Sequence, residues 1–404
     1  MYANYHPVND TLTPTHQAGE AVGAQHGGSR NWAGYLAVAA LGLLVLAGCV
    51  GNDLNPNAGW SGVVDGGHVV YVGSMEGQLL ALDAETGLFR AAFPSVLDED
   101  EEVFGAIYAT PVLRNGLIYL GGFNGKVYNI GADGLLPRTP SFEVNGDELS
   151  KGIVGTVAVS GDKIVVGASE SAETGRIYVL NAESFNESCR YPASLDDSIG
   201  RVWSGPVVDD SMAFVGDLSH RLYAISLDDC SLQWTADLNG GIASTPLVVD
   251  GDLYVGTFDR RFYRVDIDDG TAEVVFQAGG WFWSGIATDG RMLFVPNMDG
   301  KLYAVDIASG TVAWEFDTEG AALSAPVIVD DRVVVASDSK VVYVLQANSG
   351  ARLWEFLVNA DVRAPLMAKG SVVYVSSLDH KIYAVDIDAR RTFWREPFDT
   401  KANR

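Results

Sequence analysis

The residue types that most often do chemistry in proteins are few and scattered in this chain. Its 404 residues include six histidines and three cysteines, Cys49, Cys189 and Cys230. We find no Ser-His-Asp order, no cysteine–histidine zinc spacing and no glycine-rich phosphate loop. The segment from Asp266 to Gly270 begins like a calcium loop but lacks the distal glutamate that such a loop needs. The sequence therefore predicts no catalytic, cofactor-binding or metal-binding residue.

These side chains are positioned by a sequence repeat of about forty residues. Residues 289–316 contain three short runs of alternating apolar residues, separated by Asp-Gly and Ala-Ser-Gly turns, as in antiparallel strands joined by hairpins. One tyrosine marks most copies, and the last five are spaced by 40 residues: Tyr128, Tyr178, Tyr223, Tyr263, Tyr303, Tyr343 and Tyr383. A further strand precedes each copy at a step of small residues and proline. The pattern predicts an all-β, eight-bladed β-propeller of four-stranded antiparallel blades over residues 59–397, with a tail at 398–404.

Large apolar side chains recur three residues before the small-residue step. They are Trp60, Tyr108, Val154, Trp203, Ala243, Trp283, Leu323 and Val362. Packing between neighbouring blades explains such a ring, and a binding patch at the mouth of the central channel is the alternative. Under that alternative the candidate interface residues are Phe104, Tyr108, Trp281 and Trp283.

The charge balance limits the partners. With 27 basic and 52 acidic residues, the net charge is −25. Such a surface repels nucleic acid and anionic lipid headgroups, so we expect neither as a partner.

Residues 1–48 differ in character from the repeats. An apolar run extends from Ala33 to Ala47 and is shorter than the roughly 20 residues of a membrane span. It leads into the sequence Leu46-Ala47-Gly48-Cys49. It is typical of a secretory signal with small residues at the cleavage site. The ending resembles the lipobox of bacterial lipoproteins, which implies that Cys49 is acylated and that residues 49–58 tether the propeller. An uncleaved membrane anchor is the alternative.

Several turns carry a second resemblance. Ala304, Gly310 and Trp314 form A-x(5)-G-x(3)-W, which resembles the docking motif of the eight-bladed propellers with pyrroloquinoline-quinone (PQQ) repeats. Related positions are Gly350 and Trp354, Ala224 and Trp234, and Ala384 and Trp394. The resemblance implies that the tryptophan of one blade stacks over the turn glycine of the next, so that Trp394 reaches Gly87 and closes the ring. Blades 1 and 5 depart from it, with Ala91 and Val274 in place of tryptophan.

The same docking rule places two cysteines together. Cys189 has the tryptophan position of blade 3, and Cys230 has the glycine position of blade 4. The resemblance therefore implies a Cys189–Cys230 disulfide in place of a dock, with two unrelated buried thiols as the alternative. Export from the cytoplasm would permit the bond.

The family resemblance also suggests a role. The lipobox, the blade count and the size are similar to those of the BamB-type lipoproteins, which implies a non-enzymatic scaffold that is exported, lipid-anchored and monomeric on the periplasmic or cell-surface side. Its partner would be an envelope protein, with the barrel-assembly machinery as the candidate. A ligand-binding surface lipoprotein is one alternative. A PQQ-dependent dehydrogenase is another, although the adjacent cysteine pair of that family is missing here.

Overall fold

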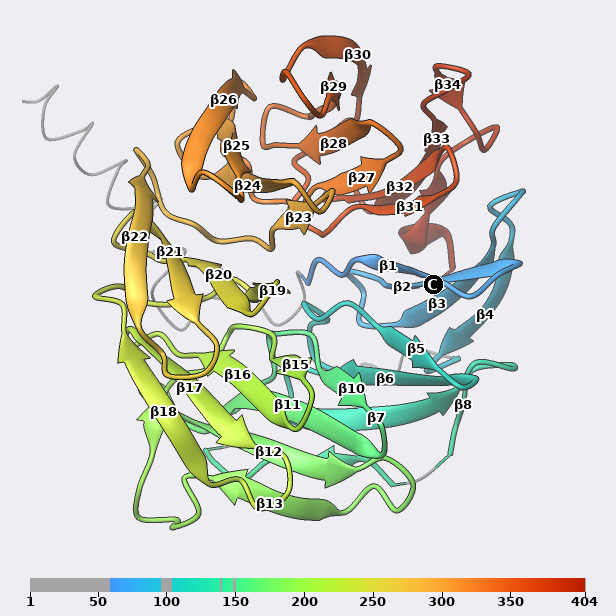
Figure 1. The fold of residues 1–404 in the computed structure, drawn as a ribbon. Helices are drawn as coiled ribbons and strands as arrows, with labels where there is room; N and C mark the ends of the chain where they lie inside the picture. The colour runs from blue at the N-terminus through green and yellow to red at the C-terminus, as the bar shows by residue number, and fades with distance from the viewer. Residues whose placement is uncertain (1–58, 96–103, 139, 148–149, 404) are drawn as a thin grey trace, which may run out of the picture. The chain divides into compact units, whose positions relative to one another are not determined.

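The computed structural model describes residues 59–95, 104–138, 140–147 and 150–403. In these residues the chain forms eight antiparallel sheets in chain order, and Figure 1 shows them arranged as a ring with the first strand of each sheet innermost. The predicted eight-bladed propeller is confirmed.

The first four blades follow one another without shared strands. Blade 1 has β1 (Val63–Asp65), β2 (Val69–Gly73), β3 (Leu79–Asp83) and β4 (Phe89–Phe93). Blade 2 has β5 (Val112–Arg114), β6 (Leu117–Gly121), β7 (Lys126–Gly131), β8 (Leu136–Pro137) and β9 (Phe142–Glu143). Blade 3 has β10 (Ala158–Ser160), β11 (Lys163–Ser169), β12 (Thr174–Asn181), β13 (Glu187–Tyr191) and β14 (Ile199–Gly200). Blade 4 has β15 (Val207–Asp209), β16 (Met212–Gly216), β17 (Arg221–Ser226) and β18 (Leu232–Asp237).

Of the last four blades, blades 5, 6 and 7 are four-stranded and blade 8 has a fifth strand. Blade 5 has β19 (Leu247–Val249), β20 (Asp252–Gly256), β21 (Arg261–Asp266) and β22 (Ala272–Gln277). Blade 6 has β23 (Ala287–Thr288), β24 (Met292–Asn297), β25 (Lys301–Asp306) and β26 (Thr311–Asp317). Blade 7 has β27 (Val327–Val329), β28 (Arg332–Ala336), β29 (Val341–Gln346) and β30 (Arg352–Leu357). Blade 8 has β31 (Met367–Lys369), β32 (Val372–Ser377), β33 (Lys381–Asp386), β34 (Arg391–Thr392) and β35 (Phe398–Asp399), followed by the 3-10 helix η1 (Thr400–Asn403).

The hydrophobic core is divided among the seams between blades. Each of the eight clusters of buried side chains joins two neighbouring blades, and together they complete the circle. The two middle strands of a blade are buried on both faces, because a four-stranded sheet can bury its faces only against its neighbours. The propeller also extends past the expected boundary at residue 397, since β35 pairs with β33 in blade 8.

Three tryptophans lie on the turn glycine of the following blade. A Cβ atom on Gly87, Gly270 or Gly350 would stand 2.6–2.7 Å from the indole of Trp394, Trp234 or Trp314, respectively. Each indole Nε1 donates a hydrogen bond to a carbonyl of the same turn, to Ala84 O (2.9 Å), Ile267 O (3.0 Å) and Ala347 O (3.0 Å). Only glycine leaves room for this stacking. The backbone of these turns also has a positive φ at this position, which glycine adopts without strain.

Two predicted docking residues behave differently. Gly310 has open space above it and holds no tryptophan, because blade 5 supplies none. Trp354 packs against the seam between blades 7 and 8, where Arg390 with φ 53° stands in place of the turn glycine. Gly310 is therefore not a docking position within this chain, which corrects the expectation from the motif.

Blades 8 and 1 close the ring through side chains alone, since each is built from consecutive residues. Trp394 is 2% exposed in the core of this seam, and Tyr374 donates a hydrogen bond to Ala84 O at 3.0 Å. At the surface, Lys369 pairs with Asp65 at 2.8 Å. Further in, His380 Nδ1 lies 2.6 Å from Oε1 of Glu76, whose side chain is buried.

The two cysteines of the propeller are bonded to each other. Cys189 in β13 and Cys230 in the turn before β18 form a disulfide across the seam between blades 3 and 4, with a sequence separation of 41. Cys230 has φ 58° and is buried, as expected for a residue at the glycine position of a dock.

Candidate functional site

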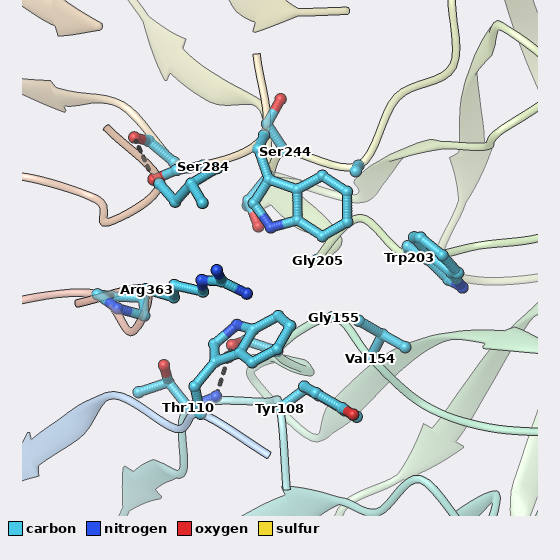
Figure 2. A pocket seen from close by; sticks show the side chains of 17 residues that line it. Tyr108, Thr110, Val154, Gly155, Trp203, Gly205, Ser244, Ser284 and Arg363 are labelled. Carbon is cyan, nitrogen blue, oxygen red and sulfur yellow. Dashed lines mark hydrogen bonds between the residues drawn. The ribbon is translucent and has the colours of Figure 1, made fainter. Parts of the chain in front are cut away.

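Every blade contributes to the lining of a small cavity in the central channel, and one larger side chain or its equivalent from each blade forms a ring (Figure 2). The cavity has a volume of about 100 Å³. We call these residues the channel ring: Trp60, Tyr108, Val154, Trp203, Ala243, Trp283, Leu323 and Arg363. Four are aromatic, three are aliphatic and one is a cation. The loops that lead into the inner strands position them, so the ring follows from the repeat.

An aromatic platform lies on one side of the channel ring. Trp203 and Trp283 meet edge to face, with ring centroids 5.9 Å apart. Phe258 stacks on Trp283 at 5.7 Å and on Trp281 at 5.0 Å. Trp281, Trp283 and Phe258 are all partly exposed. The two predicted tryptophans therefore lie together, and Phe258, which the sequence reasoning missed, joins them.

The other predicted aromatics are more buried. Tyr108 is 5% exposed and meets Trp60 edge to face at 4.7 Å; burial raises the pKa of its hydroxyl. Phe104 is fully buried, where it packs against Phe93 and Tyr128 in the seam between blades 1 and 2. Phe104 therefore cannot contact a partner, which corrects its assignment to the interface.

Arg363 takes the place in the channel ring that was expected for Val362. Val362 is fully buried in the seam between blades 7 and 8, whereas the guanidinium of Arg363 points into the cavity (Figure 2). The signal was present in the sequence, because Arg363 is 40 residues after Leu323 and 80 after Trp283. Alignment on the Ala364-Pro365 step shifted the assignment by one residue.

The charge of Arg363 is balanced within the chain. Its Nη2 lies 3.4 Å from Asp338 Oδ2 and 3.5 Å from Asp361 Oδ2, and its guanidinium lies 5.9 Å from the ring centre of Trp60. Burial raises the pKa of the Asp338 carboxyl, while Arg363 opposes that shift. This cluster of one cation and two carboxylates presents no surplus positive charge to a ligand.

Arg201 differs, because no carboxylate among the described residues pairs with it. It precedes Trp203 by two residues, and its guanidinium lies over that indole at 4.8 Å. It is half-buried, and this burial lowers the pKa of its guanidinium. Within the described part of the chain, Arg201 Nε and Trp203 Nε1 are buried without hydrogen-bond partners. A half-buried arginine that has one buried unpaired nitrogen and, in the described ranges, no carboxylate partner favours an anionic partner group at this place.

Comparison of the sequence with models of known protein families identifies the family. The family model described as outer membrane protein assembly factor BamB matches residues 193–280 and 276–403, together just over half of the chain. The chain belongs to this family of PQQ-repeat propellers. No curated protein sequence matches the propeller at a significant level.

Solved structures show the fold of this PQQ-repeat propeller and a range of activities. BamB from Moraxella catarrhalis is 17% identical, with a TM-score of 0.64 over 80% of this chain and 95% of that one. A quinohemoprotein alcohol dehydrogenase from Pseudomonas putida HK5 is 15% identical, with a TM-score of 0.64 over 81% and 70%. The computationally designed protein Ika8 is 14% identical, with a TM-score of 0.67 over 82% and 97%. BamB, an alcohol dehydrogenase and a designed protein thus share this architecture, so function must be argued from the site.

The predicted lipid anchor cannot be located in the structure. Cys49 and the segment before it are outside the described residues. In the part that is described, no helix is long and apolar enough to cross a membrane. The same residues contain no group of three histidine, cysteine or acidic side chains placed to hold a metal ion.

Proposed function

We propose that this propeller is an exported, lipid-anchored scaffold that binds a partner protein at the mouth of its channel. The observation that carries the proposal is the aromatic platform of Trp203, Trp281, Trp283 and Phe258 beside the unpaired Arg201. Trp281 and Trp283 are partly exposed, whereas Trp203, which Arg201 covers, is 4% exposed. Tryptophan and arginine together are typical of interface hot spots. Membership of a family described as outer membrane protein assembly factor BamB agrees with a role in the cell envelope.

The size of the channel cavity supports a protein partner. About 100 Å³ is well below the roughly 300–1,000 Å³ of sites for drug-sized ligands and cofactors. The channel ring as it stands does not fit a fused-ring quinone, and its only cation is already balanced by Asp338 and Asp361. A cavity of this size fits one side chain that protrudes from a partner loop.

The chemistry of the platform specifies the partner segment. An apolar side chain would cover the tryptophans, and a neighbouring acidic side chain would reach Arg201. Pairing would satisfy the guanidinium that the fold leaves unpaired and would displace little bound water, because Arg201 is already half-buried. We therefore expect an acidic residue next to a large apolar residue in the partner.

Site-specific photocrosslinking in native membranes tests the proposed function. A photoreactive amino acid at Trp281 should yield one dominant envelope-protein adduct. The same group at Leu357, which is 68% exposed on the outer strand β30, should not yield that adduct. Equal labelling from both positions, or no adduct from Trp281, would contradict a binding surface at the mouth.

Removal of the unpaired cation gives a prediction for affinity. Arg201→Gln should weaken binding of the crosslinked partner about tenfold or more, as the loss of one charged contact implies. Arg260→Gln is the matched control, because it removes the same charge from an exposed residue in the turn that carries Phe258. Titration by surface plasmon resonance at two salt concentrations should show weaker salt dependence for Arg201→Gln than for Arg260→Gln. Equal affinities of the two variants would refute the role of Arg201.

The lipid anchor gives a separate prediction. Cys49→Ser should move the protein from the membrane pellet to the soluble fraction, because the residue that would carry the acyl chains is gone. The propeller should keep its unfolding midpoint, since Cys49 precedes the blades. Metabolic labelling with a palmitate analogue should mark the wild-type chain only; labelling of Cys49→Ser would place the lipid elsewhere.

A further inference from the structure

The outer ends of seven of the eight seams are closed, in one of several ways. There, the outer strand of one blade meets the turn before the outer strand of the next. Tryptophan closes four seams, and the disulfide closes the seam between blades 3 and 4. Where blades 1 and 2 supply no tryptophan, the next blade places Leu135 or Phe185 at the glycine position, with φ 52° and 59°, and both are buried. Seven seams are thus filled from within the chain.

The seam between blades 5 and 6 has no such side chain. The β-bulge of the outer strand, which precedes the tryptophan in blades 4, 6 and 7, lies at Val275 in blade 5. Glu273 therefore stands opposite Arg264, where the other blades place tryptophan opposite alanine or valine. Arg264 pairs with Asp252 at 2.9 Å and with Glu273 at 3.4 Å, and Val274 is 49% exposed. The space above Gly310 stays open.

The turn at Gly310 nevertheless has the features of an occupied dock. Its φ of 63° is close to the 69–75° of Gly270 and Gly350, and Gly310 N bonds Asp306 O at 2.9 Å, as the other two bond their own turns. In those turns Ile267 O and Ala347 O accept an indole N–H at 3.0 Å. The equivalent acceptor here is Ile307 O, and no donor among the described residues reaches it. Arg264 adds a guanidinium that can stack on an aromatic face.

We propose that the dock at Gly310 binds a tryptophan side chain of a partner protein. The indole face lies on Gly310, its Nε1 donates to Ile307 O, and its edge meets Arg264. The occupied docks of the same chain supply the ligand chemistry, because three copies of this turn hold an indole in this way. The site is on the outer wall, so it is independent of the proposed binding at the mouth.

Titration of the whole mature protein with N-acetyl-5-fluorotryptophanamide, followed by ¹⁹F NMR, tests this proposal. We expect saturable binding, and the analogue methylated at the indole nitrogen should bind roughly fivefold more weakly, because it cannot donate to Ile307 O. The comparison needs no variant, so it stands even if a substitution impairs folding. Equal affinities for the two probes, or no saturable binding, would overturn the proposal.

Two glycine variants localise the site. Gly310→Leu copies the arrangement at Leu135 and should abolish saturable binding of the probe. Gly370→Leu is the matched control, since Gly370 also has open space above it and a similar φ of 57°, but lies in another turn. Binding that survives Gly310→Leu, or that both variants lose equally, would show that the indole binds elsewhere, such as at the aromatic platform. Neither variant touches Arg201, so failure here leaves the mouth proposal unaffected.

Discussion

Trp394→Ala should lower the free energy of unfolding by about 3–5 kcal/mol, which is the usual cost of replacing a buried phenylalanine or tryptophan with alanine. Trp394 is 2% exposed, lies on Gly87 and donates to Ala84 O. Its removal leaves a cavity in the seam that joins the last blade to the first, and it takes one of two hydrogen bonds from Ala84 O, which keeps the bond from Tyr374. Guanidinium denaturation, followed by near-ultraviolet circular dichroism, measures the loss.

A neighbour provides the control for Trp394. Phe393, the residue before Trp394, is 39% exposed, so Phe393→Ala removes an aromatic ring without opening the seam. Its unfolding midpoint should stay close to that of the wild type. Equal destabilisation by the two substitutions would mean that Trp394 contributes no more than general surface packing.

The double substitution Cys189→Ser/Cys230→Ser should cost about 4 kcal/mol, the chain-entropy value for a loop of 41 residues. The bond restricts the unfolded chain and also closes a seam that has no tryptophan. Denaturation with and without a reductant should show the same loss in the wild-type protein, and the reductant should not affect the double variant.

Peptide mass spectrometry after alkylation checks the bond directly. Cys189 and Cys230 should resist alkylation until the unfolded protein is reduced. Modification of either residue without reduction would contradict the disulfide. The single variant Cys49→Ser should keep the reductant-sensitive midpoint, since it leaves the pair intact.

The fold could be predicted from the sequence because each blade repeats the same pattern of strands and turns. Strand alternation, turn glycines and the 40-residue spacing predicted the number of blades, and the motif placed Trp394 beside Gly87 and Cys189 beside Cys230. Each of these depends on local pattern and on a fixed neighbour relation, so no long-range packing had to be known.

The predictions of site residues were wrong where the packing between blades, which the local sequence pattern does not show, decides the exposure of a side chain. Phe104 and Trp281 both precede an inner strand, but the seam between blades 1 and 2 covers Phe104 completely. A shift of the bulge in β22 moved Glu273, not Val274, opposite Arg264, and spacing cannot show such a shift. Arg201 could be recognised as unpaired only once its neighbours in space were known.

Closure by side chains alone has a consequence for the order of events when the chain is made. Blade 1 shares no strand with blade 8, yet its outer turn is covered only when Trp394 of blade 8 packs on Gly87. A chain that emerges from a ribosome or a membrane pore N-terminus first therefore keeps this side of blade 1 uncovered until blade 8 has emerged. Molecules that lack blade 8 would expose Val70, Val72 and Leu80, and we expect proteases to remove them.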